Sequence, residues 1–339
     1  MPTTLSEPTQ SQQTTQFSTA ESEQYSRQLY LAGFGAAKQK KLKQSKVLLV
    51  GAGGLGCPAG LYLAAAGTGQ LDCLDFDTVD RSNLHRQIAY TANDIGQSKA
   101  QCLASKLSAM NPFIAVNSLQ TRLDETTVMA ILSDTAYDLI IDGTDNYTTR
   151  YLLADGCYLL KKALLQGAVE GFSAQITLFA HQAIDPVQSE QPACYRCVFP
   201  EPPESPGLNC DAMGVLGVLP GTTGLMMATE AIKFLTGMPT ASKNALLSYN
   251  AINLSLKTMA LKNDPACLLC GLKTIQYPAA EQAACKIPAE QAAYKMPKKI
   301  LQKNNWQFVQ NSAFQDTAAG EGGGGRRGGG GRAAAGAGG

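Results

Sequence analysis

The residues best suited to chemistry in this chain are cysteines that stand in two closely spaced pairs. Cys194 and Cys197 form the first Cys-x-x-Cys pair, and Cys267 and Cys270 form the second. Four thiolates in two such pairs are the ligand pattern of a closed tetrahedral zinc site with a structural role. We therefore expect these four cysteines to hold Zn²⁺, in preference to four free core cysteines. The ion would tie the irregular segment after residue 193 to the chain near residue 270.

A glycine-rich loop lies well upstream of the cysteines. Gly51, Gly53 and Gly56 have the spacing Gly-x-Gly-x-x-Gly and directly follow the apolar run 46–50. Glycines in this context allow a tight turn and let backbone N–H groups approach phosphate at the start of the following helix. Asp75 ends the next predicted strand, where a carboxylate can hydrogen-bond ribose hydroxyls. Taken alone, these residues predict a nucleotide site and fit an NAD-dependent enzyme equally well.

The residues that follow Asp75 favour a nucleoside triphosphate over NAD. Segment 77–87 brings arginines, an asparagine and carboxylates together directly after the expected ribose position. A triphosphate needs cations around its β- and γ-phosphates and a carboxylate to hold Mg²⁺, whereas a nicotinamide ring needs little extra positive charge. Because the charged residues of this segment are grouped beside a phosphate loop, we do not expect them to be ordinary solvated surface charges. The residues that could supply these groups are Arg27, Arg86, Lys99 and Asp145.

The order of the predicted elements indicates an α/β fold. Strands are expected at 46–50, 70–75, 138–142, 164–169 and 172–180, and helices at 55–66, 98–110 and 147–161, with Ser98 as a helix N-cap. Strands separated by helices predict a doubly wound, Rossmann-like, mostly parallel sheet. Little regular structure is expected over 193–220, followed by an amphipathic helix at 222–235. Two short strands near 246–250 and 253–261 complete a C-terminal, zinc-clamped antiparallel extension.

The two ends of the chain differ in composition from its centre. Residues 1–22 are rich in Ser, Thr and Gln, and we expect a disordered leader without a secretory signal. The globular domain is expected over 23–272 and a weakly ordered extension over 273–317. Gly and Arg dominate 318–339, which predicts a disordered tail. Weak RNA binding by this tail is a less favoured interpretation than a solvated tail without function.

Composition argues against several classes of function. The 339 residues carry a formal net charge of +1, so we expect no nucleic-acid or membrane-surface binding driven by electrostatics. The sequence has no apolar stretch of about 20 residues that would form a membrane-spanning helix. Its ten cysteines indicate metal-binding or catalytic thiols more than disulfides in a chain of this kind. The expected compartment is the cytoplasm.

Taken together, the motifs resemble those of the MoeB/ThiF/HesA family of ubiquitin-activating-type adenylyltransferases. The resemblance covers about residues 23–272, and many separate motifs occur in the family's order. They lie at 25–28, 51–56, 74–79, 82–87, 96–99, 142–146, 194–197, 209–217 and 267–270. This combination is far more specific than a glycine-rich loop alone.

The resemblance implies that ATP activates the C-terminal glycine carboxylate of a small ubiquitin-like sulfur carrier that ends in Gly-Gly. The products would be an acyl adenylate and pyrophosphate. The implied contacts are Gly54 with the nucleotide, Asp75 with the ribose, Asn83, Arg86 and Lys99 with the phosphates, and Asp145 with Mg²⁺, with Asn146 as a further cofactor-binding candidate. In the family, the residue that matches Arg27 reaches the ATP of the neighbouring subunit, so a homodimer is implied.

The carrier and the source of its sulfur stay open at this stage. Cys210 matches a cysteine that some relatives use in sulfur transfer, and a catalytic thiol and an inert one are weighed equally. No rhodanese-like pattern follows residue 270, so sulfur is expected from a separate protein. The molybdopterin-synthase small subunit is the favoured carrier, and the thiamine-pathway carrier is the alternative.

Two other classes of protein are less favoured. An NAD-linked oxidoreductase does not explain the cations between Arg81 and Arg86. A catalytically silent scaffold would be expected to have lost one or more of the charged residues proposed for the site, yet all of them are present.

Overall fold

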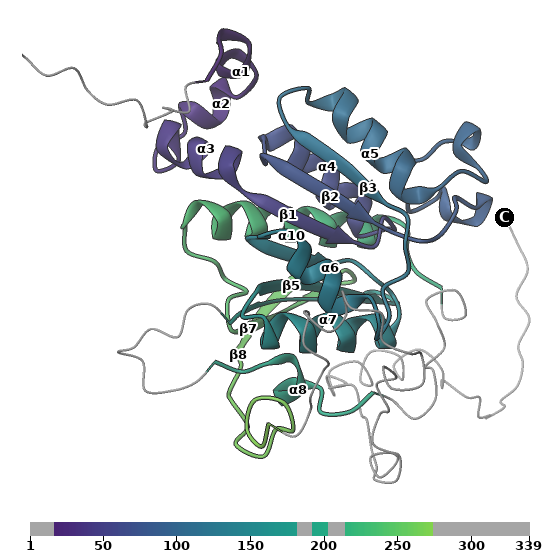
Figure 1. Ribbon diagram of the computed structural model, residues 1–339, viewed down its shortest axis with the longest axis vertical. Coiled ribbons are helices and arrows are strands. Elements are labelled where there is room, and N and C mark those ends of the chain that lie inside the picture. Colours follow the sequence, from purple (N-terminus) through teal and green to yellow (C-terminus); the bar gives the residue numbers. More distant parts are fainter. Residues whose placement is uncertain (1–16, 182–191, 203–213, 274–339) are drawn as a thin grey trace, which may run out of the picture. The chain divides into compact units, whose positions relative to one another are not determined.

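One mixed sheet organises the residues described by the computed structural model, which are 17–181, 192–202 and 214–273 (Figure 1). Within them, eight strands follow the order β3-β2-β1-β4-β5-β6-β7-β8. The strands are β1 Lys46–Val50, β2 Gln70–Leu74, β3 Ala115–Leu119, β4 Leu139–Asp142, β5 Ala163–Glu170, β6 Ser173–Ala180, β7 Ala245–Asn250 and β8 Ser255–Ala260. Neighbours from β3 to β5 are parallel, and neighbours from β5 to β8 are antiparallel. The predicted mostly parallel sheet with an antiparallel extension is confirmed.

The helices lie before, between and after these strands. They are α1 Thr19–Gln24, α2 Ser26–Leu29, α3 Gly35–Gln44, α4 Gly56–Ala66, α5 Lys99–Met110, α6 Val128–Asp134, α7 Tyr147–Leu159, α8 Tyr195–Val198 and α10 Val218–Thr236, with short 3₁₀ turns η1 Arg81–Asn83 and η2 Ala92–Asp94. All described residues belong to one compact unit. No helix among the described residues is long and apolar enough to cross a membrane.

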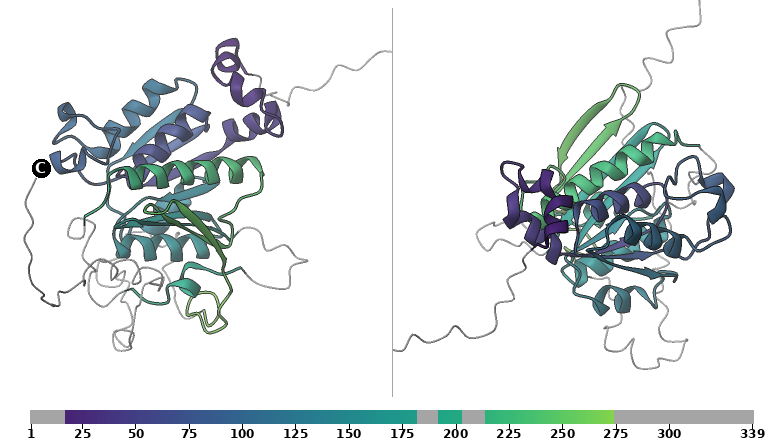
Figure 2. Two further views of the ribbon diagram at one scale, coloured as in Figure 1. Left: turned by 180° about the vertical axis from the view of Figure 1, so that it is seen from behind. Right: turned by 90° about the horizontal axis from the view of Figure 1, so that it is seen from above.

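Helices cover both faces of the parallel half of the sheet, as a doubly wound fold requires (Figure 2). Successive side chains of a strand point to opposite faces, so β1 supplies two separate cores. Val47 and Leu49 pack with α4, α5 and α10, whereas Leu48 and Val50 pack with α7. All four are at most 1% exposed. This burial on both sides explains why β1 is a continuous apolar run in the sequence.

Local sequence signals fix several helix boundaries. The Ser98 hydroxyl caps α5 by accepting a hydrogen bond from the Gln101 backbone N–H, so the predicted N-cap is confirmed. Asn111, which precedes a proline, ends the same helix. Gly67 and Gly237 end α4 and α10 in the left-handed conformation that a glycine adopts without strain.

The structure differs from the sequence expectations in several segments. Helix α1 begins at Thr19, inside the expected leader, because Ser18 and Glu21 form a capping box. Helix α8 and the first turn of α10 lie within 193–220, where little regular structure was expected. Pro220 occurs in the first turn of α10, where its missing N–H costs no intrahelical hydrogen bond. The expected weakly ordered extension, beyond residue 273, and the Gly/Arg tail lie outside the described residues.

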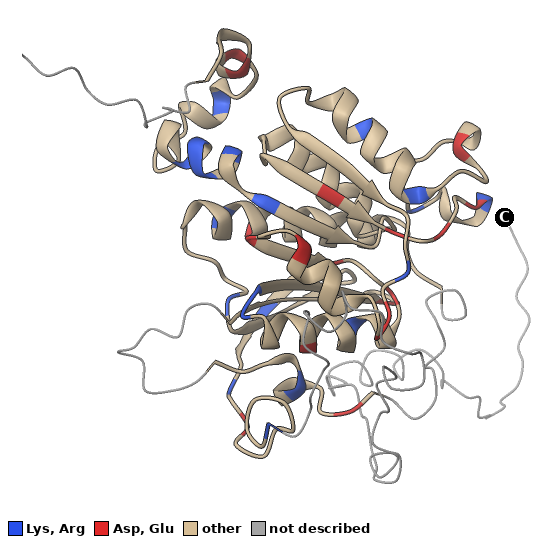
Figure 3. Cartoon of the chain, viewed as in Figure 1, with Lys and Arg blue, Asp and Glu red and all other residues tan. Residues whose placement is uncertain are grey.

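Charged residues gather at strand ends and on helix surfaces and are sparse within the strands (Figure 3). Helix α3 alone carries four lysines. Four cysteines outside the two Cys-x-x-Cys pairs, Cys57, Cys73, Cys102 and Cys157, are buried in the core.

Candidate functional site

A cavity lies where the carboxyl ends of β1, β2 and β4 meet. In a doubly wound sheet this edge, at the point where the strand order reverses, is the usual place for a ligand. Glycines 51, 53 and 54 follow β1, Asp75 follows β2, and residues 143–146 follow β4. Of the predicted site residues, those that line the cavity are Gly51, Gly53, Gly54, Asp75, Arg86, Lys99, Asp145 and Asn146.

The glycine loop owes its shape to close backbone contacts. Gly51 has a φ of +89°, and a Cβ on it would lie 3.0 Å from the Gly143 carbonyl carbon. A Cβ on Gly54 would lie 2.9 Å from Cβ of Pro220, so the start of α10 forms a wall of the cavity. Gly53 is free of such contacts. Gly56, although predicted to bind the cofactor, does not line the cavity: its Cβ would lie only 1.8 Å from the Gly51 carbonyl oxygen.

Asp75 is a buried carboxylate held by two backbone donors. Its Oδ2 accepts from the N–H of Ala52 at 2.8 Å, and its Oδ1 accepts from the N–H of Asp77 at 2.8 Å. Burial raises the pKa of Asp75, and these two hydrogen bonds oppose that shift. Each carboxylate oxygen keeps a further lone pair for a ligand hydroxyl.

Lys99 stands at the first position of α5 with its side chain almost fully buried. Its Nζ lies 3.1 Å from Oδ2 of Asp77, which is half exposed and also lines the cavity. The Tyr90 hydroxyl reaches two backbone carbonyls, that of Ala52 at 2.7 Å and that of Lys99 at 3.2 Å. Tyr90 therefore links the start of α5 to the glycine loop. The pKa of Tyr90 is raised by its burial.

The loop after β4 is held by a second buried carboxylate. Oδ1 of Asp142 accepts from the backbone N–H of Thr144 at 2.9 Å and from its hydroxyl at 2.6 Å, and Oδ2 accepts from Gln166 at 3.1 Å. Burial raises the pKa of Asp142, and the charge of Arg150 acts against that shift. Arg150 donates through Nη2 to the Thr144 carbonyl oxygen at 2.7 Å. Asn146 caps α7 by accepting from Thr149 N–H at 2.8 Å.

Besides Gly56, two predicted site residues in the described part of the chain, Asn83 and Arg27, do not line this cavity. Asn83 is buried, and its Oδ1 accepts from the Asp80 N–H at 3.2 Å in a capping box. Arg27 is exposed on α2. Cys210 lies outside the described residues, so the question of its role stays as the sequence left it.

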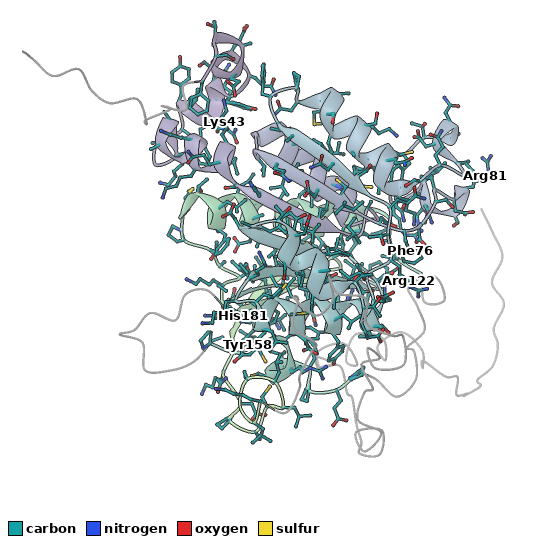
Figure 4. All side chains as sticks on the ribbon, in the orientation of Figure 1. Lys43, Phe76, Arg81, Arg122, Tyr158 and His181 are labelled. Atoms are coloured by element: carbon teal, nitrogen blue, oxygen red, sulfur yellow. The ribbon has the colours of Figure 1, made fainter. Side chains whose placement is uncertain are left out.

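Sequence reasoning missed several residues that line the cavity. Phe76 is half exposed, and its ring centroid lies 5.1 Å from Cζ of Arg122 (Figure 4). Gln87 is 4% exposed, and its Oε1 has no hydrogen-bond partner in the described part of the chain. Arg150 follows Asp145 by five residues. A signal for Gln87 was available, since it ends the 82–87 motif, whereas nothing in the sequence separated Arg150 from surface arginines.

The four predicted cysteine ligands converge at the far end of α7. Their sulfurs all lie within 4.8 Å of one another, with Cys194 and Cys267 3.5 Å apart and Cys197 and Cys270 3.3 Å apart. None of the four forms a disulfide. A tetrahedral site with Zn–S bonds of about 2.3 Å places sulfurs roughly 3.8 Å apart.

Neighbouring polar groups of the cluster point toward sulfur. The amide Nδ2 of Asn263 lies 3.2 Å from Sγ of Cys270, and the backbone N–H of Asp264 donates to Sγ of Cys197 at 3.4 Å. Donors of this kind stabilise thiolate ligands. The four thiolates and their hydrogen-bond donors therefore fit a structural metal ion whose coordination positions are all filled by protein ligands.

Comparisons with known proteins place these features in a wider group. The sequence profile of the ThiF family matches residues 25–269. A sulfur carrier protein adenylyltransferase of Thermus thermophilus is 41% identical over 253 residues, which cover 74% of this chain and 91% of that protein. The SAMP-activating enzyme E1 of Haloferax volcanii is 39% identical over 251 residues, covering 74% and 88%.

Two further similarities are more limited. A probable adenylyltransferase/sulfurtransferase of Mycobacterium tuberculosis, MoeZ, is 41% identical over 244 residues, and the match spans 60% of its length. The crystal structure of E. coli MccB with ATP has a TM-score of 0.62 at 19% identity, with 75% of each chain covered. This last similarity concerns the fold.

The contacts of the glycine loop predict that two glycines with ordinary negative φ differ in how well they tolerate an added side chain. Gly56→Ala should lower the free energy of unfolding by at least about 2 kcal/mol, because the new Cβ overlaps the Gly51 carbonyl and the backbone must move. Gly53→Ala should change it by less than about 1 kcal/mol, because its nearest neighbour, Gln87 Nε2, is 3.7 Å away. Urea denaturation followed by circular dichroism measures both. Equal stability of the two variants would contradict the packing described.

Proposed function

This chain belongs to the ThiF family, and from that premise we propose that it uses ATP to adenylate the C-terminal glycine carboxylate of a small ubiquitin-like sulfur carrier. One observation carries the proposal. At the carboxyl edge of the sheet, a glycine loop shares a cavity with three cations, Arg86, Lys99 and Arg150, and three carboxylates, Asp75, Asp77 and Asp145. Mixed charges of this kind suit a magnesium-bound triphosphate.

The geometry supports a division of roles among these residues. Gly53 and Gly54 line the cavity, where their backbone can meet a phosphate chain, and Asp75 has lone pairs for the ribose hydroxyls. We assign Arg86 and Lys99 to the phosphates. Asn83, which the sequence also assigned to the phosphates, would need its side chain to leave its capping box with Asp80.

The proposed reaction is an in-line substitution at the α-phosphorus. A carboxylate oxygen of the carrier's last glycine forms a bond to that phosphorus while the bond to the bridging oxygen of pyrophosphate breaks, so no protein nucleophile is required. Negative charge develops on the leaving pyrophosphate, and the cations of Arg86 and Lys99 neutralise it. Besides this charge neutralisation, positioning contributes to the rate enhancement, because the fixed loops hold the two reactants in line.

A bound Mg²⁺ would neutralise phosphate charge and polarise the phosphate oxygens. Carboxylates are its preferred protein ligands, and Asp145 and Asp77 both line the cavity. We assign Asp145 to the ion. Asp77 pairs with Lys99, so it would also keep that ammonium group at the cavity wall.

The carrier is a finer question than the reaction. The relatives' names include a sulfur carrier protein adenylyltransferase and a MoeZ protein. We favour the molybdopterin-synthase small subunit as the carrier, with the thiamine-pathway carrier as the alternative, and a separate protein as the sulfur donor. Cys210 is a candidate for sulfur transfer, and the cytoplasm is the proposed compartment.

We further propose that the active form is a homodimer in which Arg27 serves the partner's site. Arg27 is exposed on α2, and it is not among the residues that line the cavity of its own chain. A cationic residue supplied by a partner subunit would complete the charge neutralisation at the phosphates.

Removing a single charged group from the cavity should abolish adenylation without unfolding the protein. Lys99→Ala and Asp145→Ala should each lower the rate of carrier-dependent ATP–pyrophosphate exchange by about 100-fold or more, because each removes charge stabilisation from the transition state. Circular dichroism spectra should match the wild type. Exchange at the wild-type rate in Asp145→Ala would remove that residue from the site, and no exchange by the wild type with either Gly-Gly-ended carrier would overturn the proposed function.

Mixing two inactive variants tests the role of Arg27 in the partner's site. Arg27→Ala and Lys99→Ala homodimers should each be inactive, but after subunit exchange at equal amounts about a quarter of all sites should be intact. The rate of ATP–pyrophosphate exchange, measured before and after mixing, should therefore rise to about that fraction of the wild-type rate. If the mixture stays inactive although a tagged subunit shows that the subunits have exchanged, Arg27 acts in its own chain's site or outside the reaction.

The cysteine cluster is proposed to bind zinc in a purely structural role. The purified protein should contain about one Zn²⁺ per chain by elemental analysis. Cys267→Ser should lose the ion, and its free energy of unfolding should fall by about 3 kcal/mol or more, because metal binding here contributes to folding. Cys102→Ser is the matched control, since Cys102 is a buried thiol on α5 away from the cluster. A full complement of zinc in Cys267→Ser would exclude this site.

A further inference from the structure

One face of α7 connects the cysteine cluster with the nucleotide cavity. Tyr151, Asp155 and Tyr158 follow the spacing i, i+4, i+7, so their side chains lie on the same face of the helix. Each of them touches the chain around the first cysteine pair. The Tyr151 hydroxyl donates to the Phe199 carbonyl oxygen at 3.1 Å, and Tyr158 packs against the cysteine cluster.

The middle contact of this face is a buried ion pair. Arg196, which lies between the cysteines of the first pair, donates through Nε and Nη2 to the two carboxylate oxygens of Asp155 at 2.8 and 2.7 Å. The side chains are 4% and 0% exposed. The guanidinium also lies 4.8 Å from the centre of the Tyr151 ring and donates to the Pro200 carbonyl oxygen at 3.2 Å. A bidentate pair with such flanking contacts fixes both distance and orientation.

The other end of α7 forms part of the cavity wall. Asn146 caps the helix, and Asp145, Asn146, Thr149 and Arg150 line the cavity. At a rise of about 1.5 Å per residue, Asp155 lies about 12 Å along the axis from Tyr147. A helix of this length moves as one body, so a displacement at Asp155 also displaces the first turn.

A second contact joins the first cysteine pair to α7. The ring of Tyr195 packs against Tyr151, with the ring centroids 5.0 Å apart. The two residues between the cysteines, Tyr195 and Arg196, thus both contact α7.

We propose that Asp155 and Arg196 are positioning residues that couple the metal site to the nucleotide site. The proposal rests on the proposed function for the identity of the nucleotide and the metal. The cysteine cluster sets the position of Arg196, the ion pair sets the position of α7, and α7 sets the position of Asp145 and Asn146. Metal loss then weakens nucleotide binding although the ion touches no nucleotide. By the reciprocity of coupled equilibria, nucleotide binding must also strengthen metal retention.

Asp155→Asn tests the coupling because it removes the charge and keeps the shape. In the absence of nucleotide, amide hydrogen exchange over residues 143–150 should be about tenfold faster than in the wild type, since the first turn of α7 opens more often. The dissociation constant for ATP should rise about fivefold or more. Zinc content by elemental analysis should equal that of the wild type, because no ligand has changed.

Metal retention supplies the reciprocal measurement. ATP with Mg²⁺ should slow the release of zinc from the wild type to a chromogenic chelator about fivefold. In Asp155→Asn, the same concentration of bound ATP should leave the release rate unchanged. Tyr151→Phe is a milder variant for use if Asp155→Asn does not fold, because it loses the hydrogen bond to Phe199 and retains the ring. It should show the same effects at smaller amplitude.

Glu230→Gln is the matched control. Glu230 is also a buried carboxylate, paired with Lys233 and bonded to Ser242, but it stands on α10 far along the helix from Pro220. This variant should retain wild-type exchange over 143–150, ATP affinity and ATP-dependent zinc retention.

The outcomes separate the coupling from the proposed function. The coupling would be overturned if amide hydrogen exchange over residues 143–150 were unchanged in both folded α7 variants. It would also be overturned if Glu230→Gln showed the same changes as Asp155→Asn. A wild type that binds no ATP would overturn the proposed function, while the exchange measurement, made without nucleotide, would still test the link through Asp155.

Discussion

The contact among Gly51, Gly56 and Gly143 is the constraint on which the rest of the structure depends. A side chain on Gly56 would overlap the Gly51 carbonyl, and one on Gly51 would press on the Gly143 backbone. Only three residues without side chains let the ends of β1 and β4 come this close. That approach brings the loop with Asp145 beside the glycine loop, so backbone sterics determine the distance between the two halves of the cavity.

The sequence was sufficient to predict the parallel strands β1, β2, β4 and β5 and the glycine loop because their signals are local. The run 46–50 is apolar at every position after Lys46, since both of its faces are buried. Glycines spaced in this way directly after such a strand indicate a phosphate-binding turn. The cysteine pairs are a similar case. Their residue type and spacing define a metal site, and the fold brings the two pairs together as expected.

The remaining features depend on contacts between distant segments. Strand β3 lies at the edge of the sheet, and its side chains are largely exposed, so Ala115–Leu119 has no apolar run to reveal it. Arg150 lines the cavity because α7 starts beside the glycine loop, and that placement is a property of the packed sheet. Asn83 and Gly56 show the opposite effect: each belongs to a recognisable motif, yet the structure uses each one for local backbone geometry.

The two aspartates that flank the loop after β4 show why a motif does not assign roles by itself. Asp142 and Asp145 have the same side chain and are three residues apart, so a metal-ligand role fits either in the sequence. Asp142 is fully buried and already accepts hydrogen bonds from Thr144 and Gln166, which commits its oxygens to holding the loop. Asp145 lines the cavity. Burial therefore separates a carboxylate that builds the site from one that is open to a ligand, and the same reasoning separates Asp155, sealed against Arg196, from the residues that meet the nucleotide.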